Sequence, residues 1–125
     1  MATRNALMMM AAALALGASP ATVLAHHGWG GNAEGHIELT GKVERALSMA
    51  GPHATMKIMV DGQSWDLTLA PPPRTAAAGL REATIPVGAT VTIRGHRNLD
   101  PKRFEVKTER VTYEGKLYNV YPDRD

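Results

Sequence analysis

The chain has 125 residues, with 14 Lys and Arg against 12 Asp and Glu, a formal charge of +2 and no cysteine. The absence of cysteine excludes a disulfide framework and any thiolate metal site. Charges of both signs are interspersed along the chain, a pattern that argues against a nucleic-acid-binding protein. The length is enough for one small domain with a modest core.

The N-terminal region, residues 1–25, predicts a cleavable export signal. Arg4 supplies a positive charge, an apolar run over 6–16 follows, and Val23 and Ala25 fit the small-residue positions before a cleavage site. The apolar run is too short to span a bilayer. We therefore expect cleavage before His26, a periplasmic or secreted mature protein, and no membrane anchor after cleavage.

After an N-terminal segment, residues 26–36, apolar and polar residues alternate in the manner of β-strands. Asp61 and Gly62 predict a two-residue hairpin, and Gly41 predicts a bend within the first strand. A change of alternation predicts a bulge near Glu109 and Arg110. The expected strands cover 37–47, 56–60, 65–69, 89–97, 104–113 and 117–121.

Residues 74–80, which follow Pro73, give the single helical pattern of the mature chain. Three strands, a short helix and two or three further strands are the element order of a small OB-like β-barrel. We therefore expect a mainly β domain over 37–121, closed or partly open. An immunoglobulin-like sandwich ranks second because it needs about seven strands. The inward-facing positions predict a core that includes Trp65, Leu67, Val91, Ile93 and Val106.

Four short motifs follow one another along the mature chain. They are Ala-His-His-Gly-Trp at 25–29, Leu-Thr-Gly-Lys-Val at 39–43, Gly-Pro-His at 51–53 and Gly-Ala-Thr-Val-Thr-Ile-Arg-Gly at 88–95. In this order they resemble a family of small exported bacterial proteins of unknown function, domain of unknown function 6152. Gly28 stands where that family has serine, and Gly51 stands where it has asparagine. The resemblance implies an exported domain and assigns it no activity.

Histidines carry the chemistry that the sequence offers. A mature chain that begins at His26 presents a free α-amine and an imidazole nitrogen, with His27 beside them. His53 and His96 fall in loops that flank the usual ligand face of OB barrels, and strand alternation predicts that His96 points outward from the core. The sequence thus predicts a site for a divalent transition metal such as copper at His26, His27, His53 and His96.

Two other interpretations of these residues stay open. The histidines are equally compatible with a solvated tail, a turn residue and an exposed strand residue. Met49, Met56 and Met59 lie near His53 and resemble the ingredients of a Cu(I) site. Met56 and Met59, however, project from opposite faces of a strand, and Met56 fits the core.

No catalytic constellation is evident, because the serines lack a neighbouring base and acid and no phosphate-binding glycine loop occurs. The basic residues Arg94, Arg97, Lys102 and Arg103 lack the aromatic platform of a nucleic-acid-binding barrel, since only Phe104 lies nearby. They indicate a solvated loop, with contact to an anionic glycan or lipid headgroup as a minor alternative. We expect a non-enzymatic periplasmic binding or accessory protein without a nucleic-acid partner. The alternative is a non-metal protein–protein interaction module of the cell envelope.

Processing gives the first testable prediction. Protein recovered from the periplasm should begin at His26, because the small-residue site ends at Ala25. Intact-mass measurement or N-terminal sequencing checks this start. A recovered chain that retains residues 1–25 would contradict both export and the chelate at the terminus.

Overall fold

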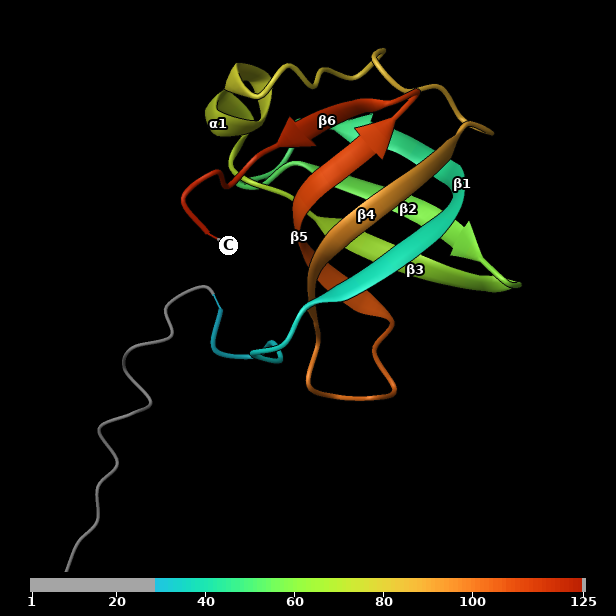
Figure 1. The fold of residues 1–125 in the computed structure, drawn as a ribbon, viewed down its shortest axis with the longest axis vertical. Coiled ribbons are helices and arrows are strands. Elements are labelled where there is room, and N and C mark those ends of the chain that lie inside the picture. The colour runs from blue at the N-terminus through green and yellow to red at the C-terminus, as the bar shows by residue number, and fades with distance from the viewer. Residues whose placement is uncertain (1–28, 125) are drawn as a thin grey trace, which may run out of the picture. The chain divides into compact units, whose positions relative to one another are not determined.

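A computed structural model describes residues 29–124 of the chain (Figure 1). The predicted signal segment and its cleavage site at Ala25 and His26 lie outside the described residues. Within the described part, no helix is both long and apolar enough to cross a membrane. The elements are β1 (Ile37–Ser48), β2 (Thr55–Val60), β3 (Gln63–Thr68), α1 (Pro72–Ala77), β4 (Thr90–Arg97), β5 (Glu105–Tyr113) and β6 (Lys116–Asn119).

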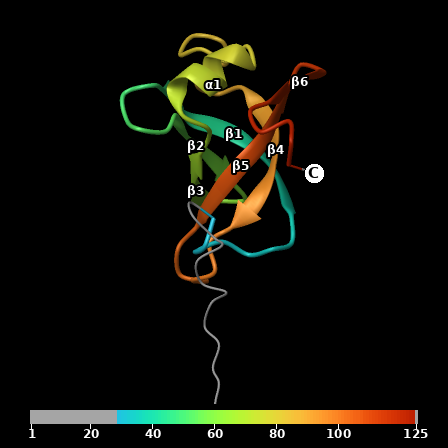
Figure 2. The ribbon, with the colours of Figure 1, turned by 90° about the vertical axis from the view of Figure 1, so that its left-hand side faces the viewer.

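The strands form one sheet that closes into a barrel. Neighbouring strands follow the order β3-β2-β1-β4-β5-β6, and a parallel pairing between β3 and the start of β5 joins the ends of a five-stranded ring. Strand β6 adds to the last part of β5. The mainly β, OB-like barrel with one helix between the third and fourth strands is thereby confirmed. The helix and the β4–β5 loop lie at opposite ends of this barrel (Figures 1 and 2).

Closure depends on the length and curvature of β1. Its first half pairs with β4 and its second half pairs with β2, and the change of partner occurs at Gly41 and Lys42. A Cβ at Gly41 would collide with the carbonyl oxygen of Met59. Only glycine lets the two backbones approach so closely, which explains the bend predicted at this residue.

The barrel interior is the hydrophobic core. Alternate residues of every strand point into it, and Ile58, Leu69 and Ile93 are fully buried. Trp65 packs its ring edge to face against Phe104, with 5.2 Å between ring centroids, and the Arg97 guanidinium lies 4.7 Å from the Trp65 ring. The predicted joint burial is confirmed for Trp65, Leu67, Val91, Ile93 and Val106.

The helix differs from the sequence prediction in its bounds. It covers Pro72–Ala77 instead of 74–80. Two prolines fit the first turn, whose N–H groups have no partner inside a helix, so the helix starts before Arg74. Gly79 has a φ of +101°, a left-handed conformation that ends the helix before Leu80.

The predicted bulge in β5 is confirmed and places a charged residue. Arg94 pairs with Arg110, whereas the next residue of β4, Gly95, pairs with Thr108, so Glu109 is the extra residue of β5. The insertion shifts the alternation, and Glu109 and Arg110 both project from the outer face of the barrel.

Trp65 tests the core. Trp65→Ala should lower the free energy of unfolding by about 3–5 kcal/mol, because it removes a large buried ring and leaves a cavity. Chemical denaturation measures this change. Met59→Ala, at a side chain exposed on β2, is the control and should change stability by less than about 1 kcal/mol. Equal effects of the two substitutions would contradict the packing described here.

Candidate functional site

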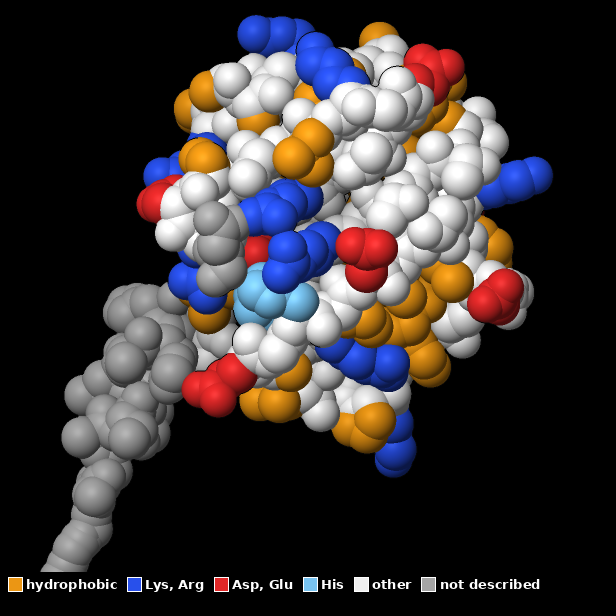
Figure 3. Space-filling view, in the orientation of Figure 1, with side chains coloured by type: hydrophobic (Ala, Val, Ile, Leu, Met, Phe, Trp, Pro, Cys, Tyr) orange, Lys and Arg blue, Asp and Glu red, His pale blue; other side chains and the backbone are white. Residues whose placement is uncertain are grey.

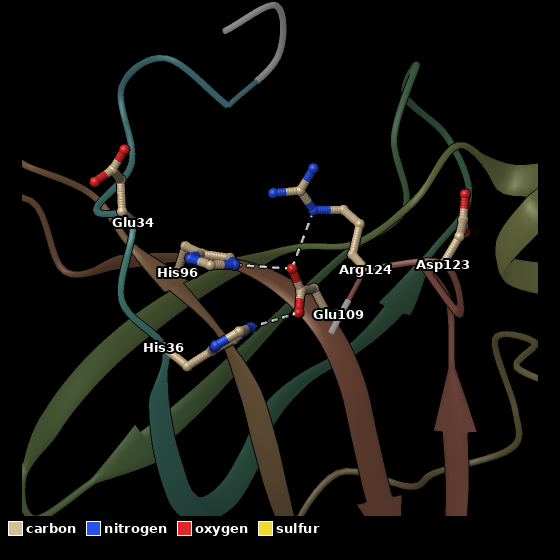
Figure 4. Close-up of a pocket in the computed structure, with 6 residues that line it drawn as sticks. All are labelled: Glu34, His36, His96, Glu109, Asp123 and Arg124. Atoms are coloured by element: carbon tan, nitrogen blue, oxygen red, sulfur yellow. Dashed lines mark hydrogen bonds and ion pairs between the residues drawn. The ribbon is translucent and has the colours of Figure 1, made fainter.

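A buried carboxylate, that of Glu109, is the centre of a polar cluster on the outer face of the barrel (Figure 4). Its Oε1 lies 2.9 Å from His36 Nε2, and its Oε2 lies 2.8 Å from His96 Nε2. The Arg124 Nε also donates to Oε2, at 3.2 Å. One carboxylate thus contacts three cationic or potentially cationic side chains.

Four separate segments supply these side chains. His36 precedes β1, His96 lies near the end of β4, Glu109 is the bulge residue of β5, and Arg124 lies beyond β6. The rings of His36 and His96 lie 4.3 Å apart, centroid to centroid, at a tilt of 41°. The site therefore exists only when both ends of the described chain are held against the barrel.

Residues 31–36, which we call the strap, are held along the end of β4 by backbone hydrogen bonds. The Ala33 N–H donates to the Arg97 carbonyl at 2.8 Å, and the Leu99 N–H donates to the Gly31 carbonyl at 2.9 Å. Asn32 forms an isolated bridge with Asn98. These contacts fix His36, the last strap residue, beside His96.

The strap corrects the environment predicted for His96. Alternation correctly places His96 on the face of β4 opposite to the core residue Ile93, but the side chain is buried and not exposed to solvent. Strap residues cover it, since its Nδ1 is 2.9 Å from the Ala33 carbonyl oxygen. The interpretation as an exposed strand residue is wrong, because a segment without strand alternation packs over this position.

The two nitrogens of His96 have different roles. A carbonyl oxygen only accepts, so Nδ1 carries the proton that is donated to Ala33. The ring orientation is thereby fixed, and Nε2 points at the Glu109 carboxylate. Histidines that bind metals commonly donate their second nitrogen to a carbonyl in this way.

The charge of Glu109 is stabilised by its neighbours. Burial raises the pKa of this carboxyl, but hydrogen bonds from His36, Arg124 and His96 lower it by more, so the net pKa lies below the ordinary value of 4.5. The carboxylate is therefore ionised at neutral pH although it is buried.

The ligand atoms of His36, His96 and Glu109 all lie within 4.8 Å of one another, close enough for one metal ion to reach all three. They line a pocket of about 330 Å³ with Glu34, Asp123 and Arg124. Two imidazoles and a carboxylate form a donor set used by zinc and other divalent transition metals, and it leaves further coordination positions open.

The structure brings one predicted ligand into this cluster and leaves another outside it. His96 is a member, whereas His53 is not. Burial, and to a smaller extent the positive charge of Lys107, lowers the pKa of His53 below 6.5. His26 and His27 lie outside the described residues.

Two members of the cluster were not selected from the sequence. His36 follows Gly35 in a segment without periodicity, so no pattern predicts its partner. Glu109 did leave a signal, because the predicted bulge marks the place where an additional side chain leaves the core alternation.

Comparison with known proteins gives information on the fold of this chain and none on the candidate site. No protein-family profile and no curated protein matches the chain. A solved structure of a ZRD-deleted mutant of TiaS in complex with agmatine is similar, with a TM-score of 0.51, 15% identity and coverage of 68% of this chain. A structure of apo TiaS, described as a tRNAIle2 agmatidine synthetase, gives a TM-score of 0.48 at 15% identity, over 62% of this chain and 18% of that one. This chain spans only 26% of the length of the first, so the likeness concerns the fold of one part of that enzyme.

The lowered pKa of Glu109 predicts a pH dependence of stability. The ionised Glu109 carboxylate contributes to the free energy of unfolding. This contribution is complete above pH 4.5, the ordinary pKa of the group, and is lost as pH falls through the lower pKa of the folded state. Glu109→Gln should lower stability at pH 7 and flatten the loss below pH 4.5. Urea denaturation of chelator-treated protein between pH 7 and pH 3 measures both effects.

Glu34→Gln is the matched control, because Glu34 is an exposed acid that lines the same pocket. Its pH profile should follow that of the unsubstituted protein. A Glu109→Gln profile parallel to both would show that the Glu109 charge does not stabilise the fold.

Proposed function

We propose that this protein is an exported, non-catalytic binding or accessory module that holds a divalent transition metal at His36, His96 and Glu109. The observation that carries the proposal is the convergence of two imidazole Nε2 atoms on one buried carboxylate. The hydrogen bond from His96 Nδ1 to Ala33 supports it, because it fixes the ring in the orientation that a ligand needs.

Metal binding at this site requires specific changes in protonation. Each Nε2 must lose the proton that it donates to Glu109, since a metal ion takes the lone pair of a neutral imidazole. The cation then replaces these two protons between the rings and the carboxylate. Affinity should therefore fall as pH is lowered.

Arg124 competes with a metal for the same carboxylate oxygen. Its Nε lies 3.2 Å from Glu109 Oε2, and its side chain is 42% exposed. The partial exposure allows the guanidinium to turn into solvent when a metal binds. In the metal-free protein, by contrast, Arg124 serves as the counter-ion of Glu109.

The predicted terminal chelate is compatible with this site and distinct from it. His26 and His27 precede His36 by about ten residues of chain, and they would add an amine and imidazole nitrogens if cleavage follows Ala25. The resemblance to the exported family of unknown function supports the location and is silent on the ligand. The metal therefore has two candidate donor sets, and the experiment must separate them.

Calorimetric titration of the mature protein, residues 26–125, with Zn(II) and with Cu(II) tests the proposal. His36→Ala should weaken binding on the order of 10–100-fold or more, since it removes one of the three ligands. The His36 ring is partly exposed, so its removal does not open the core. His53→Ala is the matched control, because it removes an imidazole outside the cluster and should leave affinity unchanged.

A form with one additional N-terminal methionine separates the two donor sets, because it moves the free amine away from His26 and keeps every side chain. If only this extension weakens binding, the terminus holds the metal and the cluster proposal fails. If no form binds either ion above the level of a His-His-Gly-Trp peptide, the cluster is a structural ion-pair network and the interaction-module alternative is preferred.

A further inference from the structure

A pair of arginines faces each other beside the metal cluster. Arg94 on β4 and Arg110 on β5 are direct cross-strand partners, so their side chains leave the same face of the sheet with Cβ atoms about 4.5–5.5 Å apart. Like charges directly opposite each other destabilise a strand pair. Figure 3 shows basic side chains beside the histidine on this face.

Arg94 forms no direct ion pair within the described residues, although an acidic side chain lies across from it on the neighbouring strand. Glu38 is its partner on β1, but Glu38 is exposed, and Arg94 forms neither an ion pair nor a side-chain hydrogen bond with any described residue. Both arginines are half-buried, and the Nε of Arg110 is buried. Two partly desolvated guanidiniums thus lie within reach of a single bound group.

Hydroxyl groups lie one step along the same strands. Thr92 and Thr112 are the next cross-strand pair on this face, and the Thr92 hydroxyl is 2.8 Å from that of Thr40. A pocket of about 140 Å³ lies between the arginine pair and the threonine pair, and the exposed side chain of Leu117 lines it as well. Glu38 lines the same pocket, so the small lining combines two guanidiniums and two hydroxyls with one acidic side chain and carries a net positive charge.

We infer that this pocket binds a small oxyanion, a carboxylate or phosphate group, between Arg94 and Arg110. A guanidinium presents parallel N–H donors that match two oxygens of such a group, and two guanidiniums can hold it from both sides. The threonine hydroxyls supply further donors. The bound negative charge offsets the repulsion between the arginines. The inference does not rest on the metal proposal, because it uses none of the cluster residues.

The test is titration of chelator-treated, isotope-labelled protein with sodium phosphate, and separately with sodium succinate, at constant ionic strength set by sodium chloride. Two-dimensional amide spectra report the site directly. Saturable shifts are expected at residues 92–94 and 110–112, with the stronger of the two ligands identifying phosphate or carboxylate as the preferred group.

Arg94→Gln should weaken this binding at least about tenfold, because it removes one of the two guanidiniums. Arg81→Gln is the matched control: it makes the same charge change at an exposed loop residue and should leave affinity within twofold. Arg94→Lys keeps the charge and loses the fork, so its affinity should fall between the two. His36→Ala should bind phosphate and succinate as the unsubstituted protein does, which keeps this result separate from that of the metal titration.

Thermal melting confirms that each variant is folded before it is titrated. Absence of saturable shifts with both anions would overturn the inference. Equal weakening by Arg94→Gln and Arg81→Gln would also overturn it, because the effect would then arise from net charge and not from this pocket.

Discussion

The buried carboxylate of Glu109 is the constraint on which the arrangement of the outer face depends. A charge that is buried away from solvent must be compensated by polar or charged partners. The Glu109 carboxylate is surrounded by His36, His96 and Arg124. Removal of one partner from a buried charge typically costs about 3–5 kcal/mol, so the carboxylate strongly favours the conformation in which all three are present. It thereby ties the strap, β4, β5 and the segment after β6 together.

The same compensation sets the conditions for a metal site. A metal ion would replace two imidazole protons and the contact with Arg124, so its net affinity is the difference between two favourable arrangements of one carboxylate. Because a metal ion and a proton compete for the same ligand atoms, the affinity for the metal should fall as pH is lowered. In the adjacent pocket, Arg94 forms no ion pair with a described residue, and Glu38 is a single acid beside two guanidiniums. We therefore propose an anion for that pocket and a cation for the cluster.

The sequence predicts the barrel well because strand alternation is a local signal. Val91 and Ile93, or Trp65 and Leu67, show their burial through neighbours two residues away. The bulge at Glu109 is also local, since the alternation changes within β5. The cluster is not local: His36 and Glu109 are 73 residues apart, and the strap that carries His36 has no periodicity. Sequence patterns could therefore select His96 but not its partners, nor the cover that buries it.

Anomalous diffraction from crystals of the zinc-loaded protein, recorded at the zinc absorption edge, tests the central claim most directly. The account predicts one peak about 2.0–2.2 Å from the Nε2 atoms of His36 and His96 and from a carboxylate oxygen of Glu109, with Arg124 turned away. A peak elsewhere, or a Glu109 carboxylate that still contacts both imidazoles and Arg124 under saturating zinc, would contradict it.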